Sequence, residues 1–213
     1  MPTITKIAEQ KRRANRRNVY LDGKFAFGCN VNVVAKFYLR EGMQLSPEQV
    51  EAIKRGEIQQ ECFDKATEYL GRRLHSRAEL HKKLMRQEYG EDIVKAVLEE
   101  LTRLGYVDDE RFAKTKALSA TQYKRQGRRR VFMELLKSGV QAEVANRALD
   151  DVFEEVDSTA LAKQLIVKQL PRLRKLDPAV AKRRLTGMLQ RRGFDYDAIR
   201  PLIDEVLGSE PSE

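Results

Sequence analysis

An internal repeat is the feature that most constrains how this chain of 213 residues folds. Shifting the sequence by 51 residues, and then by a further 54, superimposes eight apolar positions in three copies. Spacings of three and four residues along a helix produce one buried stripe. Small units of this kind bury the apolar surfaces between them by stacking on their neighbours, which predicts an elongated and curved array. The superimposed positions are Leu80, Leu84, Tyr89, Ile93, Val94, Val97, Leu98 and Leu101 in the first copy, Val131, Leu135, Val140, Val144, Ala145, Ala148, Leu149 and Val152 in the second, and Leu185, Leu189, Phe194, Ala198, Ile199, Leu202, Ile203 and Val206 in the third.

The same periodicity predicts three helices in each copy. One residue sets the first copy apart: Gly139 and Gly193 occupy equivalent points after the second helix of their copies, whereas the first copy has Glu88 there. Glycine suits the left-handed end of a helix, so we expect a different turn at Glu88. The helices are expected at 61–72, 77–87, 91–104, 109–124, 128–138, 142–153, 158–171, 178–191 and 197–207.

The first 30 residues predict β-strands joined by a tight turn. Asp22-Gly23 is a two-residue hairpin signal between two β-prone runs. Pairing across this turn places Tyr20 opposite Phe25 and Asn18 opposite Phe27, so that the three aromatic rings share one face.

A lone hairpin is only marginally stable in water, so other elements must cover it. The β-prone run at residues 3–7 can add a third strand, and a helix is expected at residues 31–39. A second helix is expected from Ser46, with Pro47 at its first position and Gln49 completing a capping box. The polar residues 55–57 predict a linker to the repeats.

These patterns predict a mainly α-helical protein. Its architecture is three tandem three-helix repeats in an elongated arc, preceded by a small segment that contains a β-hairpin. The expected domains are residues 1–57 for the hairpin and its helices, 58–107 and 108–156 for the first two repeats, and 157–213 for the third repeat and a tail.

The charge of the chain indicates an acidic partner. Lysine and arginine total 41 against 32 aspartates and glutamates, a net charge of +9, and the surplus lies in the first 60 and the last 56 residues. Such a surplus is typical of proteins that bind nucleic acid or an acidic protein face. The sequence has no run of 18 apolar residues, no signal-peptide pattern near Met1, and only Cys29 and Cys62, so we expect a cytoplasmic protein.

No pattern in the sequence predicts catalysis. His75 and His81 are six residues apart, which does not place them on one helical face, and neither lies near a cysteine at metal-ligand spacing. The acidic residues Asp108, Asp109 and Glu110 precede an expected helix, where negative charge is favourable. We therefore expect no enzyme, no cofactor and no metal, and a nuclease is disfavoured because the carboxylates are dispersed.

Three basic clusters recur at equivalent places in the repeats. Each is expected just before, or in the first turn of, the second helix of its repeat, where positive charge opposes the helix dipole by roughly 0.3–1 kcal/mol per group. Replacing Arg128 and Arg129 with Glu would then slightly stabilise the fold. Because the N–H groups of a helix start also attract anions, we interpret the clusters as sites for a partner or for phosphate. The alternative interpretation is that each cluster is an ordinary solvated face. The residues are Arg72, Arg73 and Arg77; Lys124, Arg125, Arg128, Arg129 and Arg130; and Lys182, Arg183 and Arg184.

Several segments of the chain resemble the RecX family. Leu104–Ala113, with the sequence LGYVDDERFA, is the most specific match, and Gly127–Arg130 is similar to the basic helix start of that family. Glu88 departs from the glycine that the family usually has. The other similar segments are Asn18–Gly28, Leu39–Leu45, and Tyr69–Arg73 followed by Ser76–Leu80.

The resemblance implies three tandem three-helix repeats after a small β-containing segment, and it implies a role. A RecX-like protein is a non-enzymatic modulator of the RecA recombinase that lodges in the groove of the RecA–single-stranded DNA filament. It inhibits strand exchange, ATP hydrolysis and co-protease activity, and thereby modulates DNA repair and the SOS response. The monomeric state is expected separately, because stacked repeats contact only their neighbours. Weak direct contact with DNA is a further expectation.

A second interpretation remains open from the residues themselves. Two adjacent helices in each unit can imitate a helix-turn-helix, which would make the chain a general DNA-binding protein. The basic groups occur as arginine runs without the Asn or Gln base readers that direct readout often uses, which weakens this interpretation.

Overall fold

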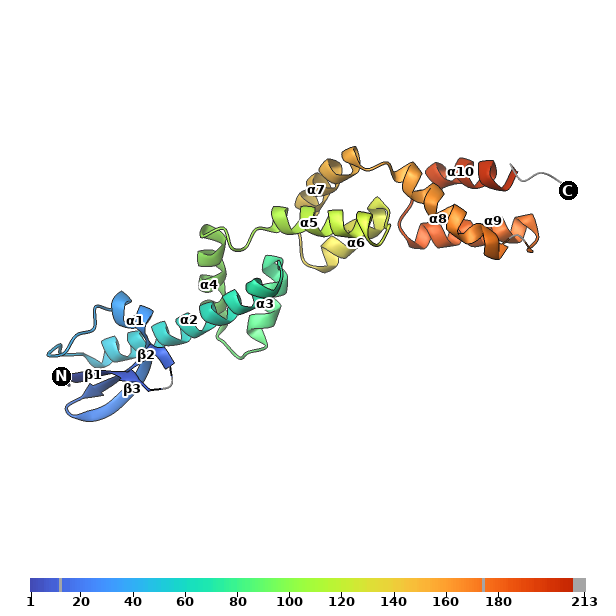
Figure 1. Ribbon diagram of the computed structural model, residues 1–213. Coiled ribbons are helices and arrows are strands. Elements are labelled where there is room, and N and C mark those ends of the chain that lie inside the picture. The colour runs from blue at the N-terminus through green and yellow to red at the C-terminus, as the bar shows by residue number, and fades with distance from the viewer. Residues whose placement is uncertain (12, 174, 209–213) are drawn as a thin grey trace. The chain divides into compact units, whose positions relative to one another are not determined.

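The computed structural model of this protein describes residues 1–11, 13–173 and 175–208. The chain divides into two compact units, Met1–Leu74 with Leu80–Tyr106, and His75–Glu79 with Val107–Glu213. Within the described residues, three strands precede ten helices along the chain (Figure 1). The mainly α-helical class is therefore confirmed. Part of the expected C-terminal tail lies outside the described residues.

The N-terminal sheet is antiparallel, with the order β1 (Ile4–Gln10), β2 (Arg13–Leu21) and β3 (Lys24–Asn30). Both turn residues have positive φ, 48° at Asp22 and 80° at Gly23, as the tight hairpin requires. The predicted third strand is β1.

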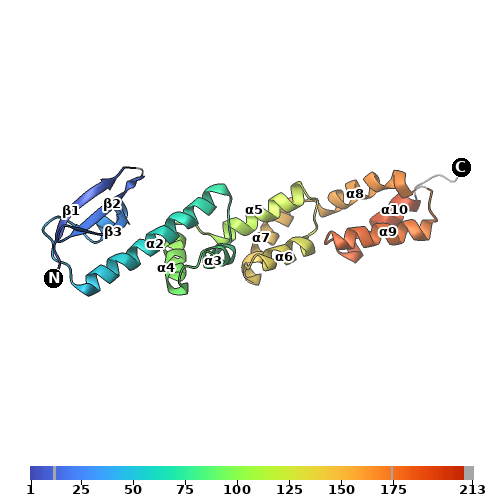
Figure 2. The same cartoon turned by 90° about the horizontal axis from the view of Figure 1, so that it is seen from below.

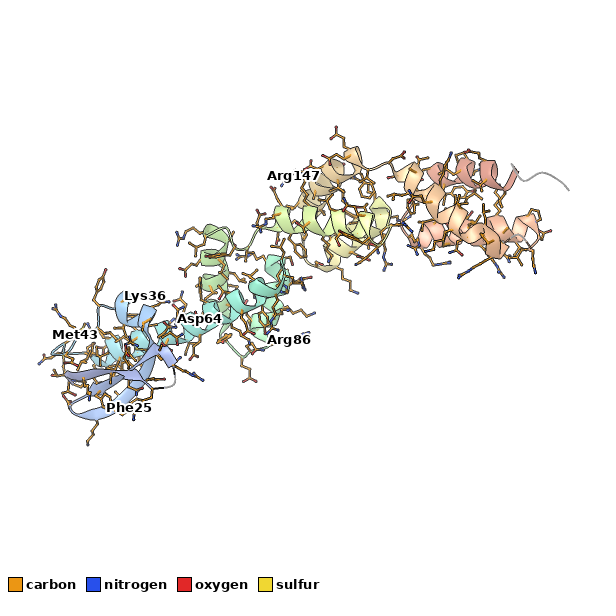
Figure 3. All side chains as sticks on the ribbon, viewed as in Figure 1. Phe25, Lys36, Met43, Asp64, Arg86 and Arg147 are labelled. Carbon is orange, nitrogen blue, oxygen red and sulfur yellow. The ribbon has the colours of Figure 1, made fainter. Side chains whose placement is uncertain are left out.

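Only part of the predicted strand pairing is confirmed. Tyr20 lies opposite Phe25 with the rings edge to face at 6.0 Å, but Phe27 pairs with Val19 and not with Asn18. The register shifts between these pairs because β3 contains one extra residue, a β-bulge that a period-two pattern does not reveal. Phe27 therefore packs against the buried Val19, while Phe25, labelled in Figure 3, is 60% exposed.

Two helices cover the sheet. The first, α1 (Val31–Lys36), is shorter than predicted, and α2 (Pro47–Arg72) has the predicted capping box between Ser46 and Gln49. The predicted linker at residues 55–57 is wrong, because α2 runs through it and contains the predicted helix 61–72 as its second half. The expected domain limit after residue 57 consequently falls inside α2.

The residues of the supposed linker pack against the N-terminal segment. A Cβ on Gly56 would meet the ring of Phe37, so the helix approaches α1 closely at this residue. Glu57 is 8% exposed; its carboxylate accepts the N–H of Asn30 at 2.7 Å and lies 2.8 Å from the guanidinium of Arg16. Tertiary contacts therefore stabilise the helical conformation at residues 55–57, although these are a glycine and two charged residues.

The other helices of the repeats begin and end close to their predicted limits. Most of the superimposed apolar positions are buried, with Ala198 an exposed exception. The core of the third repeat joins its three helices through Ile166, Leu185 and Ile203. The helices are α3 (Arg77–Met85), α4 (Glu91–Arg103), α5 (Asp109–Gln122), α6 (Arg128–Lys137), α7 (Ala142–Glu155), α8 (Ser158–Leu173), α9 (Pro178–Arg191) and α10 (Tyr196–Gly208).

The turn after the second helix of each repeat has the same backbone conformation in all three copies. The φ angle is 62° at Glu88, 79° at Gly139 and 87° at Gly193, so the prediction of a different turn at Glu88 is wrong. Glycine is required in the second and third copies because a side chain would not fit there. A Cβ at Gly139 would overlap the Cβ of Ala78, and one at Gly193 would overlap the backbone of Arg130. The first copy follows the sheet segment and not another repeat, so Glu88 escapes this requirement.

Candidate anion-binding surface

The first basic cluster lies at the end of one helix and the start of the next. Arg72 belongs to the last turn of α2, where positive charge suits the helix dipole, and it pairs with Glu68 at 2.6 Å. Arg73 is the C-cap and donates to the carbonyl of Leu74 at 2.7 Å. The expected dipole cost is therefore wrong for Arg72.

Arg77 is the first residue of α3, as predicted. Its backbone N–H donates to Asp109 Oδ1 at 2.8 Å, and the N–H of Glu79 in the same turn donates to the hydroxyl of Ser76 at 3.0 Å. Protein groups thus occupy the helix start that the sequence offers to an anion.

The second cluster surrounds the start of α6, and the end of α9 covers that start. The N–H of Gly127 donates to the carbonyl of Arg192 at 2.8 Å, and the N–H of Arg129 donates to that of Gly193 at 3.2 Å. Figure 2 shows this end of α9 beside the link between α5 and α6. Two of the N–H groups expected to attract an anion here are therefore engaged by carbonyls of the protein, which leaves the basic side chains as the main anion-binding groups.

The side chains of the second cluster divide into paired and unpaired groups. Arg128 lies 2.8 Å from Asp150, and Arg130 lies 2.9 Å from Glu134. Within the described part of the chain, no carboxylate pairs with Lys124, Arg125 or Arg129. These three groups carry the net positive charge of the cluster.

The third cluster lies one turn later in its helix than predicted. Because α9 begins at Pro178, with Asp177 accepting the N–H of Ala179 at 2.8 Å, residues 182–184 belong to the second turn. Lys182 is held by Asp204 of α10 at 2.5 Å. Arg183 and Arg184 instead line a groove that also contains residues of α8.

This groove, which we call the arginine groove, has a volume of about 550 Å³. Its basic residues are Arg172 of α8, Arg183, Arg184 and Arg191 of α9, and Arg192 at the end of α9. Leu173, Leu185 and Met188 form apolar lining, and no aspartate or glutamate lines the groove in the part of the chain that the structure describes. Arg172, Arg191 and Arg192 are not among the site residues predicted from the sequence. The sequence does contain a signal for Arg191, because residues 184 and 191 are two helical turns apart and share a face of the predicted helix.

The two cysteines and the buried histidine are residues with chemistry other than charge. Burial raises the pKa of both Cys29 and Cys62 to about 11, which keeps these thiols protonated and poorly nucleophilic. The ring of the buried His75 lies 3.1 Å from Glu79. Among the described residues, no three His, Cys, Asp or Glu side chains are placed to hold a metal ion, and no helix is long and apolar enough to cross a membrane.

The architecture defines a class: tandem three-helix domains behind a small sheet, with arginine-rich surfaces. The RecX N-terminal domain model matches residues 2–46, and models for the first, second and third RecX three-helix domains match residues 62–101, 108–149 and 155–203. The chain belongs to the RecX family of regulatory proteins.

Individual relatives agree with this assignment. The Regulatory protein RecX of Bacillus subtilis (strain 168) is 30% identical over 97% of this chain and 78% of its own length. The Regulatory protein RecX of Leuconostoc mesenteroides is 28% identical over 100% of this chain and 79% of its own length. A crystal structure of regulatory protein RecX has a TM-score of 0.84 and 26% identity, covering 99% of this chain and 100% of that one. The fold is also that of RecX from Lactobacillus salivarius, with a TM-score of 0.64 and 22% identity over 71% of this chain and 97% of that one.

Proposed function

We propose that this protein is a non-enzymatic regulator that binds the RecA–single-stranded DNA filament. It lowers the recombinase, ATPase and co-protease activities of the filament, and so modulates DNA repair and the SOS response. Membership of a family of regulatory proteins supports this role. It acts in the cytoplasm, as a monomer and without a cofactor.

The observation that carries the proposal is the set of arginines without carboxylate partners on the second and third repeats. Arg125 and Arg129 of the second repeat, and Arg183 and Arg184 of the third, lie at or near the protein surface without an acidic neighbour in the described residues. Unpaired guanidinium groups suit the phosphates and acidic side chains of a nucleoprotein filament, because arginine binds both in a bidentate manner.

The alternative of helix-turn-helix DNA recognition is disfavoured by the contact between α6 and α9. A recognition helix contacts base edges through its N-terminal residues. At the start of α6, Gly127 and Arg129 are bonded to the end of α9, which lies where the DNA groove would have to be. The second repeat therefore lacks a free recognition helix of this kind.

The test is the ATPase activity of RecA on circular single-stranded DNA, measured over a titration of this protein. We expect the rate to fall as the concentration of this protein rises, and the co-protease activity to fall in parallel. An unchanged rate at a molar excess over RecA would contradict the proposed function. Hydrolysis of ATP by the protein alone would contradict its non-enzymatic part.

A further inference from the structure

We propose that the arginine groove binds the sugar-phosphate backbone of single-stranded DNA, and that Tyr123 stacks on a base beside it. The inference deepens the proposed function, on which its biological role rests, by assigning the DNA contact to the junction of the second and third repeats. The groove, the tyrosine and the contact between them all belong to the second compact unit of the chain.

The basic side chains of this unit are unevenly paired with carboxylates. Several basic side chains outside the groove have acidic partners: Arg147, labelled in Figure 3, lies 2.6 Å from Glu110, and Lys163 lies 3.0 Å from Glu205. Inside the groove, within the described residues, no carboxylate pairs with Arg172, Arg183, Arg184 or Arg191. Like charges gathered in one concave site raise its potential and attract an anion.

The arginines of the groove form an extended row. Arg184 and Arg191 are seven residues apart on α9, about 10 Å along the helix axis. Arg172 faces them from α8, and Arg192 follows at the end of α9. This row is longer than a single phosphate group, so it suits a chain of phosphates.

The lining of the groove suits a nucleic acid strand better than an acidic peptide. The groove is lined by two helices whose internal N–H groups are bonded within the helices, so it offers no edge to the backbone of an extended peptide. A phosphodiester strand needs only cations along its backbone and apolar surface for its sugars and bases. Leu173, Leu185 and Met188 supply that apolar surface between the arginines.

An exposed aromatic residue lies near one end of the groove. Tyr123, the C-cap of α5, is 82% exposed, and it precedes Lys124, whose carbonyl accepts from the guanidinium of Arg192 at 2.9 Å. The tyrosine is therefore held next to one end of the groove. Exposed aromatic rings beside a basic channel are the platforms on which single strands stack, whereas the paired bases of a duplex are not available for stacking. The ligand is accordingly single-stranded and not duplex DNA.

The experiment measures the binding of fluorescent oligo(dT) by anisotropy over a series of salt concentrations, without RecA. The charge-reversing variant R183E/R184E is expected to bind at least tenfold more weakly. Its salt dependence should be shallower by about 1.4 in log–log slope, because two phosphate contacts of roughly 0.7 each are lost. A matched control, K168E/R200E, makes the same change of net charge at exposed residues outside the groove and should keep the wild-type slope.

Tyr123 is tested separately. Y123A should bind oligo(dT) about fivefold or more weakly, the lower end of a base–aromatic stack, while Y123F should bind as the wild type does. Wild-type protein should also prefer oligo(dT) to a duplex of equal length. Thermal unfolding by circular dichroism checks each variant, and R183Q/R184Q replaces the glutamate variant if that one unfolds.

Four results would overturn the inference: no binding of oligo(dT), equal losses in the groove and control variants, competition by polyglutamate as strong as that by oligo(dT), or a preference for duplex. The proposed function fails by a different result. A protein that inhibits the RecA ATPase without binding oligo(dT) refutes the groove assignment alone, and one that binds oligo(dT) without inhibition refutes the regulatory role alone.

Discussion

The backbone N–H of Gly127 donates to the carbonyl of Arg192 at 2.8 Å, which places the start of α6 on the end of α9. The terminal carbonyls of α9 therefore face the arginine-rich first turn of α6. A helix C-terminus carries partial negative charge, so it offsets the unfavourable effect of these arginines on their own helix. The same contact leaves no room for a side chain at Gly193.

Replacing Gly193 with Ala should destabilise the protein by about 2–4 kcal/mol, since a left-handed backbone conformation and overpacking against Arg130 each cost about 1–2 kcal/mol. Gly105 is the matched control, because it has φ 73° and nothing within 4 Å of an added Cβ. G105A should lose only the backbone part, about 1–2 kcal/mol. Urea unfolding of both variants measures the difference, and equal losses would show that the junction does not need glycine.

Replacing Glu88 with Gly should stabilise the protein by about 1 kcal/mol, because Glu88 has φ 62° and glycine has no Cβ penalty there. The position lies in the turn that follows α3, which ends at Met85. Thermal unfolding measures the change. A loss of stability would mean that the Glu88 side chain contributes more than its backbone strain costs.

Replacing Arg128 with Glu should cost about 0.5–1 kcal/mol, because the exposed pair with Asp150 at 2.8 Å is lost and two like charges then meet. This reverses the sign predicted from the helix dipole alone. Exchanging the two charges in R128E/D150R should restore most of the stability, and failure of the exchange would refute the pairing. Arg129 has no acidic partner in the described residues, so R129E should change stability by less than about 0.5 kcal/mol while weakening inhibition of the RecA ATPase.

Glu57 should make the protein relatively more stable in acid. Burial raises the pKa of its carboxyl, although the N–H of Asn30 and the charge of Arg16 oppose the shift. A raised folded-state pKa means that the folded protein binds the proton more tightly, so this contribution is full below the unfolded pKa and is lost as the pH rises through the folded value. Urea unfolding from pH 4 to pH 7 should show the advantage of wild type over E57Q falling as the pH rises.

Glu48, in the same helix, should contribute to stability with the opposite dependence on pH. The Ser46 hydroxyl lowers the pKa of this exposed carboxyl, so its contribution is present above the unfolded pKa and is lost as the pH falls. The advantage of wild type over E48Q should therefore shrink in acid. If the stability difference between wild type and variant changed with pH in the same direction for E57Q and E48Q, Glu57 would not be buried as described.

The two thiols should be inert in the folded protein. Cys29 and Cys62 are fully buried, and burial raises the pKa of each to about 11. Because the thiolate is the reactive form, an aromatic disulfide reagent at pH 8 should modify neither cysteine natively and both in denaturant. Rapid modification of the native protein would contradict the packing of β3 and α2.

Local patterns determined most of the helices and their ends. The stripe of Leu80 and Leu84, the cap at Ser46 and the proline at Pro178 each act within a few residues, so the sequence by itself predicts the elements they form. The three basic clusters, too, are visible as runs of charge.

Contacts between distant residues decided the rest. The bulge that pairs Phe27 with Val19, the passage of α2 through Gly56 and the glycine requirement at Gly193 each depend on a partner at least eight residues away. The arginine groove likewise exists only because α8 and α9 pack side by side, which brings Arg172 to Arg184. Periodicity reports which face of an element is buried, but it carries no information about which other element covers that face. Only the tertiary structure therefore separates the arginines that are paired from those that are free to bind an anion.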